Sequence, residues 1–331
     1  MTQHLQTQPR SGRTAITGST GFVGRHLMSR MIEKGSDVTL LVQDARKCPA
    51  GWRDNPHIHI VQTGPLEQAD DLCEALRDAA TVIHLGGLAH VKSAEAARFM
   101  AANAEGTERL AAASARVGVK TFVHLSSIAA ITENAASGTI SEATPARPGG
   151  PYGQSKQAAE RHVSALAAQG IFAASLRPPL VVGADAPGNW RTLQQLALSG
   201  APLPFGNTSN RRAYIGVDTL VEMLDLLSAH EWGSDKSGDY CIANVEKLSL
   251  TQVLSLLRQA MGKRRALFSV PSRLLIAPLV LLGQRRITQS LFGDLDIDSR
   301  RFRDTFAFSE ARGIREEIHK SGYEFALNAP A

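Results

Sequence analysis

Residues 14–24 read Thr14-Ala15-Ile16-Thr17-Gly18-Ser19-Thr20-Gly21-Phe22-Val23-Gly24, a short apolar strand followed by three spaced glycines. Apolar residues then recur at helical spacing over residues 22–34, and Gly35 follows, which predicts a helix. Glycines in such a turn let the backbone approach a pyrophosphate, and the N-terminus of the helix supplies N–H donors. We therefore expect a dinucleotide site at this turn, lined by Gly18, Thr20, Gly21, Phe22, Val23 and Gly24.

Further apolar runs alternate with helical patterns along the first half of the chain. Strands are predicted at residues 37–42, 58–61, 81–85, 121–125 and 172–176, and helices at 94–117 and 154–169. Strands that alternate with helices imply a parallel sheet covered on both faces. With right-handed crossovers, the prediction is an α/β fold with a doubly wound, Rossmann-like sheet.

After Arg177 the pattern changes, because Pro, Gly and Asn become frequent through Asn210 and strands become sparse. Residues 1–13 are predicted to be a flexible tail, 14–180 a dinucleotide-binding domain, and 213–243 a return to it, with a strand at 240–243. Helices are predicted at 217–228 and 251–261. Residues 181–212 and 244–331 then form a smaller, interleaved α/β region for the substrate, near the carboxyl ends of the strands.

The composition excludes several classes of protein. Hydrophobic residues are 43% and charged residues 20% of the 331 residues, which excludes extensive disorder. The net charge of +5 suits an anionic ligand. The sequence has no basic stripe interleaved with aromatic residues, so nucleic-acid binding is not predicted. The three cysteines form no CxxC pair, which argues against a disulfide scaffold or a zinc site. Residues 1–13 are polar and unlike a signal peptide, so we expect a cytoplasmic protein.

One apolar run leaves two interpretations open. Residues 274–284 lie between Arg273 and Arg285 and carry no charge, but eleven residues are too few to span a bilayer. The run is expected to be a buried or amphipathic helix. The alternative is a surface that touches a membrane or a lipid-linked substrate.

A second motif supplies proton chemistry. Tyr152 and Lys156 are four residues apart and so share a helix face, while Ser126 and Ser127 follow the strand at 121–125. Hydride transfer to a ketone leaves negative charge on oxygen, which a tyrosine hydroxyl can neutralise. A nearby ammonium is expected to lower the pKa of that tyrosine, and a serine hydroxyl to bind the substrate oxygen.

With both motifs, the chain resembles the extended short-chain dehydrogenase/reductase family, the NAD-dependent epimerase/dehydratase group, from about Arg13 to Tyr323. The resemblance implies Ser127, Tyr152 and Lys156 as catalytic residues, with Ser126 as the fallback for the serine. It implies that Leu85 and Gly86 pass under the adenosine, that Asn103 braces the active-site helix and that Pro178 lies beside the nicotinamide. Tyr152 and Lys156 would also contact the cofactor.

Motifs in the second half of the chain indicate which members of the family it most resembles. In relatives that act on nucleotide sugars, residues matching Arg212 and Asn189 bind the substrate diphosphate, and a guanidinium fork suits phosphate oxygens. The segments Pro178-Pro179-Leu180, Asn210-Arg211-Arg212 and Leu291-Phe292-Gly293-Asp294-Leu295 look most like bacterial 4-keto reductases and 4-epimerases of UDP-linked N-acetylated hexosamines. A few such relatives act on lipid-linked sugars.

Three segments depart from the family pattern. Pro65 stands where many relatives have an aspartate that contacts the adenine, and it lacks a backbone N–H. The loop after Ser127 lacks the usual Tyr-Gly pair. A common Gly-Trp pair near the C-terminus reads Ala307-Phe308.

The choice of cofactor depends on the end of the second strand. NAD enzymes usually place an acidic residue there, and NADP enzymes a basic one. Gln43 occupies the first position, followed by Asp44 and the bases Arg46 and Lys47, and Arg25 follows the glycine turn. We expect Gln43 and Arg46 to contact the NAD(P) cofactor, and we favour NADP over NAD. The carboxylate of Asp44 leaves NAD as the alternative.

The histidines do not predict a metal site. His84 and His124 fall in predicted core strands, and His57 and His59 alternate in another strand, without an HExxH motif. They are expected to be structural, so no metal is predicted. His90, near the cofactor edge, could reach a substrate but is not assigned a role.

These inferences favour a reductase of a 4-keto nucleotide sugar. The alternative is a nucleotide-sugar 4-epimerase that uses tightly held NAD. A dehydratase is disfavoured, because Ile128-Ala129 replaces the Asp-Glu pair usual after the catalytic Ser/Thr. From another class, a dinucleotide-binding regulatory protein remains open. The resemblance also implies a homodimer formed through the helices at 94–117 and 154–169.

Overall fold

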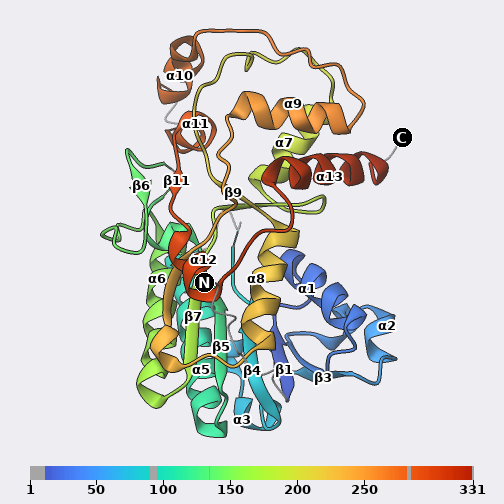
Figure 1. Cartoon of the computed structure of the whole chain (residues 1–331), viewed down its shortest axis with the longest axis vertical. Helices are drawn as coiled ribbons and strands as arrows, with labels where there is room; N and C mark the ends of the chain where they lie inside the picture. The colour runs from blue at the N-terminus through green and yellow to red at the C-terminus, as the bar shows by residue number, and fades with distance from the viewer. Residues whose placement is uncertain (1–11, 90–94, 134, 282–284, 330–331) are drawn as a thin grey trace, which may run out of the picture.

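The computed structural model describes residues 12–89, 95–133, 135–281 and 285–329. A parallel sheet, built mainly from the first half of the chain, is its largest sheet. Its seven strands lie in the order β10-β7-β5-β4-β1-β2-β3 (Figure 1). They are β1 (Arg13–Thr17), β2 (Val38–Val42), β3 (Ile58–Gln62), β4 (Ala79–His84), β5 (Thr121–Leu125), β7 (Phe172–Arg177) and β10 (Gly238–Cys241). The predicted doubly wound, Rossmann-like fold is confirmed, and β10 is the predicted late strand.

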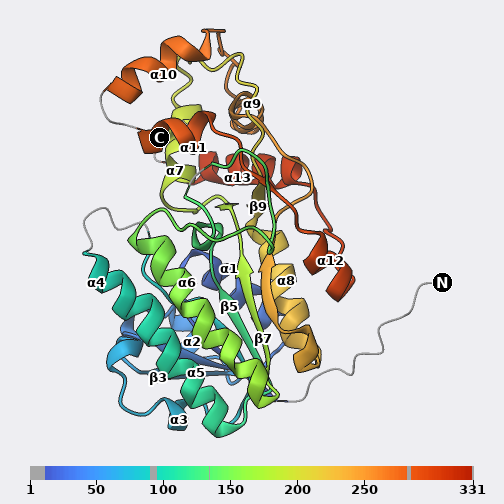
Figure 2. The same ribbon diagram turned by 90° about the vertical axis from the view of Figure 1, so that its left-hand side faces the viewer.

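Helices cover both faces of this sheet because adjacent strand residues point to opposite sides. Ile16 of β1 joins a core with α1 (Phe22–Glu33) and α8 (Val217–Ala229), whereas Ala15 joins a core with α5 (Gly106–Val117) and α6 (Pro151–Ser164). Figure 2 shows α5 and α6 side by side on their face. Short turns complete this half: α2 (Ala50–Arg53), α3 (Leu72–Ala75), η1 (Ala45–Lys47), η2 (Leu66–Gln68), η4 (Ile128–Ala130) and η6 (Ser234–Lys236).

Two helices differ from their predicted bounds in ways that matter for the site. The helix predicted at 94–117 consists of α4 (Ala96–Phe99), a π-helical turn η3 (Met100–Glu105) and α5, and residue 94 lies outside the described residues. The helix predicted at 154–169 begins earlier, at Pro151, and ends in a 3₁₀ turn, η5 (Ala165–Gln169). Proline suits the first helical position, because its missing N–H has no partner there. Tyr152 therefore lies in the first turn of α6.

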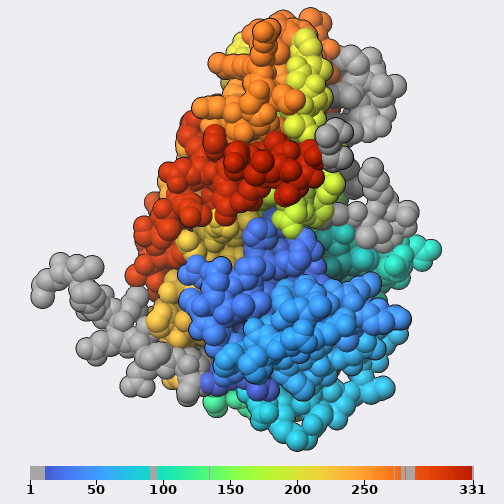
Figure 3. Space-filling view, turned by 90° about the vertical axis from the view of Figure 1, so that its right-hand side faces the viewer, coloured from blue at the N-terminus to red at the C-terminus, as the bar shows by residue number. Residues whose placement is uncertain are grey.

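The second half stacks on the carboxyl end of the sheet, and Figure 3 shows its C-terminal segments (orange and red) above the first strands and helices (blue). Its core packs Trp190, Leu254 and Ile318 from three helices. The helices are α7 (Asn189–Leu198), α9 (Leu250–Ala260), α10 (Ser272–Leu281), α11 (Arg285–Phe292), α12 (Arg300–Phe306) and α13 (Ile314–Leu327). Two small parallel pairs join β8 (Leu180–Val182) to β9 (Tyr214–Gly216) and β6 (Thr139–Ile140) to β11 (Asp296–Ile297).

Ala307, in the segment that departs from the family pattern, has an unusual backbone. It ends α12 with φ of 48° and ψ of 40°, in the left-handed region. This conformation costs an L-residue with a Cβ about 1–2 kcal/mol, whereas glycine adopts it freely. Alanine thus keeps the backbone that a glycine would favour.

The apolar run at 274–284 falls largely in α10, and residues 282–284 lie outside the described ranges. None of the helices within those ranges is long and apolar enough to span a membrane.

Candidate active site

The glycine turn packs tightly against the loop that follows β4. Gly21 N–H donates to the Gly18 carbonyl across 3.0 Å, and Gly18 has φ of 70°. A Cβ on Gly18 would lie 2.6 Å from Gly86 N, and one on Gly24 would lie 2.2 Å from Gly18 O. Only glycine fits at these two positions, so the turn and the Leu85-Gly86 loop are held together.

This turn fits the pyrophosphate of a dinucleotide. Gly21, the N-cap of α1, is exposed and offers no side chain to the first N–H groups of the helix. The Ser19 hydroxyl is buried and has no hydrogen-bond partner among the described residues. Thr20, Phe22 and Val23 are half-buried around the same turn. The first turn of α1 thus keeps donors available for an anion.

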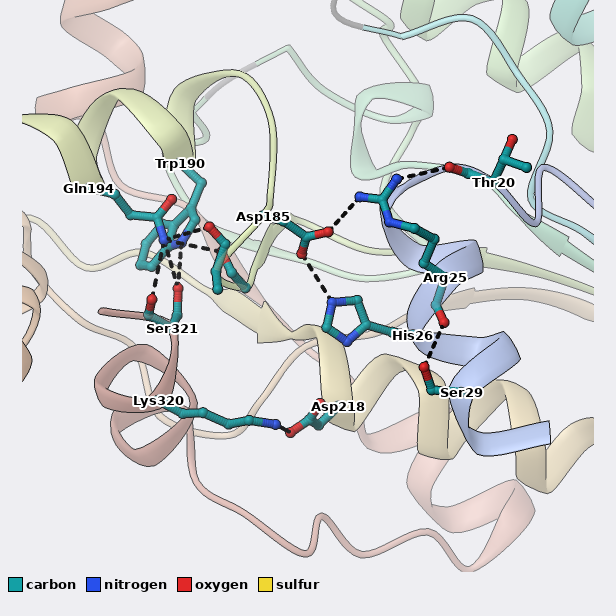
Figure 4. Close-up of polar contacts among 12 residues, drawn as sticks. Thr20, Arg25, His26, Ser29, Asp185, Trp190, Gln194, Asp218, Lys320 and Ser321 are labelled. Atoms are coloured by element: carbon teal, nitrogen blue, oxygen red, sulfur yellow. Dashed lines mark hydrogen bonds and ion pairs between the residues drawn. The ribbon is translucent and has the colours of Figure 1, made fainter. Parts of the chain in front are cut away.

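Arg25, in the first turns of α1, pairs with a carboxylate that follows β8. Its guanidinium donates to Asp185 across 2.5 Å and to the Thr20 carbonyl across 2.9 Å, and His26 lies 3.1 Å from the same carboxylate (Figure 4). Burial would raise the pKa of Asp185, but His26 and Arg25 bring it down to about 2. Arg25 therefore ties α1 to the segment between β8 and α7, and this pairing lends no support to its expected contribution to NADP preference.

The end of β2 presents Gln43 and Arg46. Gln43 is exposed, and Arg46 is held by Asp44, whose carboxylate accepts from both Nε and Nη2 at 3.0 Å. The hydrogen bond with Arg46 holds the pKa of Asp44 at about 2. Because 90% of the Arg46 side chain remains exposed, the guanidinium also faces solvent.

A chain of buried polar groups runs from the glycine turn to the active-site helix. The Thr17 hydroxyl accepts from Gly86 N–H and lies 2.6 Å from His84 Nδ1, and His84 Nε2 lies 2.9 Å from the Thr107 hydroxyl. Thr107 donates to the Asn103 carbonyl. Burial, with a smaller contribution from Lys156, lowers the pKa of His84 to about 3, so this imidazole stays neutral.

The other histidines also take structural positions. Burial lowers the pKa of His124, which stacks on His84 with ring centroids 5.5 Å apart. His57 pairs with Asp37 at 2.9 Å on the surface, and His59 is exposed. His90 lies outside the described residues. Within the part of the chain that the structure describes, no group of three His, Cys, Asp or Glu side chains is placed to hold a metal ion.

Asn103 connects three elements from the centre of the π-helical turn. Its amide donates to Ser155 Oγ of α6 at 2.9 Å and to the Leu88 carbonyl at 3.0 Å, and its Oδ1 accepts from Leu88 N–H at 2.6 Å. The side chain is 1% exposed. Its position agrees with the expected brace of the active-site helix.

The two adjacent serines have different surroundings. Ser126 is buried and donates to Glu160 Oε1 at 2.6 Å. Ser127 is half-buried, its Oγ accepts from Ala129 N–H at 3.2 Å, and it lies close enough to Tyr152 for hydrogen bonding to affect the pKa of the phenol. Ile128 N–H donates to the carbonyl of buried Pro178 at 2.9 Å, which holds the turn that carries Ser127. The geometry thus favours Ser127, and the fallback Ser126 is committed elsewhere.

The charge state of the tyrosine differs from the expectation. Burial raises the pKa of Tyr152, and the hydrogen bond with Ser127 only opposes the rise. Lys156 does not lower that pKa in this structure, because its ammonium instead donates to the Leu125 carbonyl at 2.8 Å. Burial lowers the pKa of Lys156 to about 8, although Glu160 opposes the change. The phenol is therefore protonated at neutral pH and suits a proton donor.

Sequence reasoning missed a buried carboxylate in this site. Glu160 lies one helical turn after Lys156 and accepts from Arg177 Nε at 2.8 Å and Nη2 at 2.7 Å, besides the bond from Ser126. It thereby joins α6 to the ends of β5 and β7. The signal was the spacing of 152, 156 and 160, which places all three on one helix face.

The predicted diphosphate ligands lie in the second half. Arg212 donates from Nη1 to the carbonyls of Gln289 and Gly293 at 3.0 and 2.8 Å, next to the end of α11, and burial lowers its pKa. Asn189 is exposed at the start of α7. The Arg212 guanidinium therefore holds the backbone at the end of α11.

Comparison with known proteins identifies the family to which this chain belongs. The model of the NAD dependent epimerase/dehydratase family matches residues 14–243. The chain belongs to this family, and it is an enzyme, so the reading as a purely regulatory protein is wrong.

Two of the similar proteins described here match nearly the whole chain, and a third matches about two thirds of it. It is 26% identical over 317 residues to a UDP-glucose 4-epimerase from Vibrio cholerae, covering 94% of each protein. A ceramide reductase from Caulobacter vibrioides is 32% identical over 215 residues, or 64% of this chain and 60% of the relative. The solved structure of MoeE5 with UDP-glucuronic acid and NAD has a TM-score of 0.74 at 25% identity, covering 96% of this chain and all of that one.

Proposed function

We propose that this enzyme reduces the 4-keto group of a nucleotide-linked hexosamine. The observation that carries the proposal is the placement of Ser127 close to Tyr152, which lies in the first turn of α6 and one turn before Lys156. Two hydroxyls that converge on one point can bind and protonate a single carbonyl oxygen.

The roles of the residues follow from their positions. A nicotinamide cofactor bound at the glycine turn supplies the hydride. Ser127 donates a hydrogen bond to the substrate carbonyl, and Tyr152 gives its proton to the same oxygen as the carbon is reduced. Lys156, one helical turn after Tyr152, would offer its ammonium to the ribose of the cofactor. A Cβ on Gly87 would lie 3.3 Å from Lys156 Nζ and 2.9 Å from Asn103 Oδ1, so the loop after β4 packs directly against these two side chains.

The nucleotide-sugar assignment is supported by the relatives with full-length similarity. The names of the Vibrio cholerae relative and of the MoeE5 complex both specify UDP-linked sugars. In our proposal Asn189 and Arg212 hold the diphosphate of such a substrate.

A 4-epimerase is the second candidate, and the name of the Vibrio cholerae relative favours it. An epimerase must first remove a proton from the C4 hydroxyl, so Tyr152 would have to act as a base. The raised pKa of Tyr152 keeps the phenol protonated at neutral pH, which is the state in which a reductase starts, whereas an epimerase starts from the phenolate.

For the cofactor, the family is described as NAD dependent. Within it, we propose NADP for this chain, because exposed Arg46 can meet a 2′-phosphate while Gln43 supplies no carboxylate for a ribose hydroxyl. We also propose a homodimer through α5 and α6, which lie side by side on one face of the sheet.

The experiment follows loss of reduced nicotinamide when NADPH or NADH is mixed with a UDP-4-keto-6-deoxy-N-acetylhexosamine. Oxidation that disappears in Tyr152→Phe but persists in Tyr323→Phe, a change at an exposed tyrosine of α13, supports the reductase. Interconversion of UDP-N-acetylhexosamines without net oxidation of the cofactor would instead establish the epimerase.

A further inference from the structure

The charges of the chain are distributed unevenly. Residues 247–293 contain eight Lys and Arg residues and no Asp or Glu. The whole chain has 36 basic and 31 acidic residues, so the remainder holds 28 basic residues against 31 acidic ones. The net positive charge of the protein therefore comes from this one segment.

The segment occupies the end of the molecule farthest from the sheet. In Figures 1 and 2, α10 stands at that end, and Figure 1 shows the connection from α9 to α10 running along it. The connection is anchored by Leu203 N–H to the Ala266 carbonyl and by Phe268 N–H to the Leu203 carbonyl, both at 3.0 Å. α10 itself packs against α11. The basic segment is thus held to the rest of the fold by backbone hydrogen bonds and helix packing.

Large apolar side chains are exposed among these charges. Leu274 and Val280 of α10 are 66% and 37% exposed, and Phe268 on the connection is 49% exposed. Lys263, Arg264, Arg265 and Arg273 are exposed along the same stretch. We call these seven residues the α10 surface.

We propose that the α10 surface docks the enzyme on the anionic face of a phospholipid bilayer. Lys and Arg near such a face are attracted by its negative potential. Transfer of apolar side chains from water into the interfacial region is favourable in free energy. The combination distinguishes a membrane from other occupants. A second copy of the same basic segment would be repelled, and a nucleic acid would leave Leu274, Val280 and Phe268 in water.

The test is co-sedimentation of the full-length protein with vesicles. One set mixes phosphatidylglycerol with phosphatidylcholine, and the other is phosphatidylcholine alone. We expect binding to the first set only, with release at high salt, because the attraction is screened. Each basic residue contributes roughly fivefold to binding, so the double variant Arg264→Gln/Arg265→Gln should bind about 25-fold more weakly. Leu274→Ser should also weaken binding, although it removes no charge.

The matched control removes two exposed charges elsewhere, in Arg116→Gln/Lys120→Gln at the end of α5. This variant should bind vesicles within about twofold of the wild type. Equal binding of the wild type to both vesicle types overturns the proposal, as does an equal loss in the control and the Arg264/Arg265 variant. Sedimentation velocity without lipid completes the test: a dimer that Leu274→Ser dissociates would make the α10 surface a contact between copies. Retention by an acidic protein or DNA but not by anionic vesicles would also overturn the proposal.

Discussion

Ser126 Oγ donates to Glu160 Oε1 across 2.6 Å, while the next residue, Ser127, lies close to Tyr152. Neighbouring residues in an extended segment point to opposite sides. One serine therefore joins the buried ion pair of Glu160 and Arg177, and the other faces the reaction site.

This division predicts different outcomes for two similar changes. Ser127→Ala should lower kcat about 100-fold or more, since it removes a donor to the developing oxyanion. Ser126→Ala should keep kcat within about tenfold of the wild type but lower the free energy of unfolding by about 1–3 kcal/mol, because Glu160 loses a buried donor. Steady-state kinetics and urea unfolding measure the two effects. The assignment is wrong if Ser126→Ala is the less active enzyme.

Lys156 is expected to be required for activity but to lower the free energy of unfolding. Its pKa is about 8 in the folded protein and 10.5 in a model peptide, so the buried charge is unfavourable at neutral pH. Lys156→Met should be inactive, yet more stable at pH 7 by about 1–3 kcal/mol.

The pH dependence gives the sign of this effect. Between pH 8 and 10.5 the unfolded wild-type chain binds a proton that the folded chain has lost, so wild-type stability rises with pH. The advantage of Lys156→Met should therefore shrink across that window. Lys120→Met, at an exposed position, should show no such trend in urea unfolding at several pH values. A variant that is less stable than the wild type at pH 7 would contradict the prediction.

Arg46 should discriminate between the two cofactors. Arg46→Ala is expected to raise the KM for NADPH about tenfold, because a charge-assisted hydrogen bond to the 2′-phosphate is lost. The KM for NADH should change less than about twofold. Lys47→Ala removes a neighbouring exposed charge and serves as the control. If Arg46→Ala raises the KM for NADPH and the KM for NADH equally, Arg46 does not recognise the 2′-phosphate.

Ala307→Gly should stabilise the protein. The left-handed backbone at this position strains alanine, and glycine relieves the strain at the expense of a more flexible unfolded chain. We expect a net gain of about 0.5–1 kcal/mol in the free energy of unfolding. Ala112→Gly makes the same change on the exposed face of α5 and should instead lose about 0.5–1 kcal/mol. A loss of stability in both variants would argue against strain at Ala307.

The sequence was most informative where one element could be recognised from its own residues. The strands of the main sheet are short apolar runs, and the glycine turn has a fixed relation to its strand and helix, so both were predictable. β6 and β11 have only two residues each and depend on pairing between distant segments, which no local pattern reveals.

Side-chain environment was harder to predict than position. Tyr152 and Lys156 were placed correctly on one helix face, but the expected low pKa of Tyr152 presumed that the ammonium points at the phenol. Lys156 bonds to a backbone carbonyl instead, and burial then dominates. The π-helical turn at Asn103 was likewise hidden, because an added residue per turn leaves no trace in an alanine-rich helical pattern.

The late return of β10 has a consequence for biosynthesis. β7 pairs with β5 on one side and with β10 on the other, and β10 begins only at Gly238. Until the ribosome has made that strand and it has left the exit tunnel, the edge of the nascent sheet is β7, whose residues are all buried in the finished fold, whereas the finished sheet ends in the shorter and only partly buried β10. Nascent chains that stall between β7 and β10 should therefore be the ones most prone to aggregation and most dependent on chaperones.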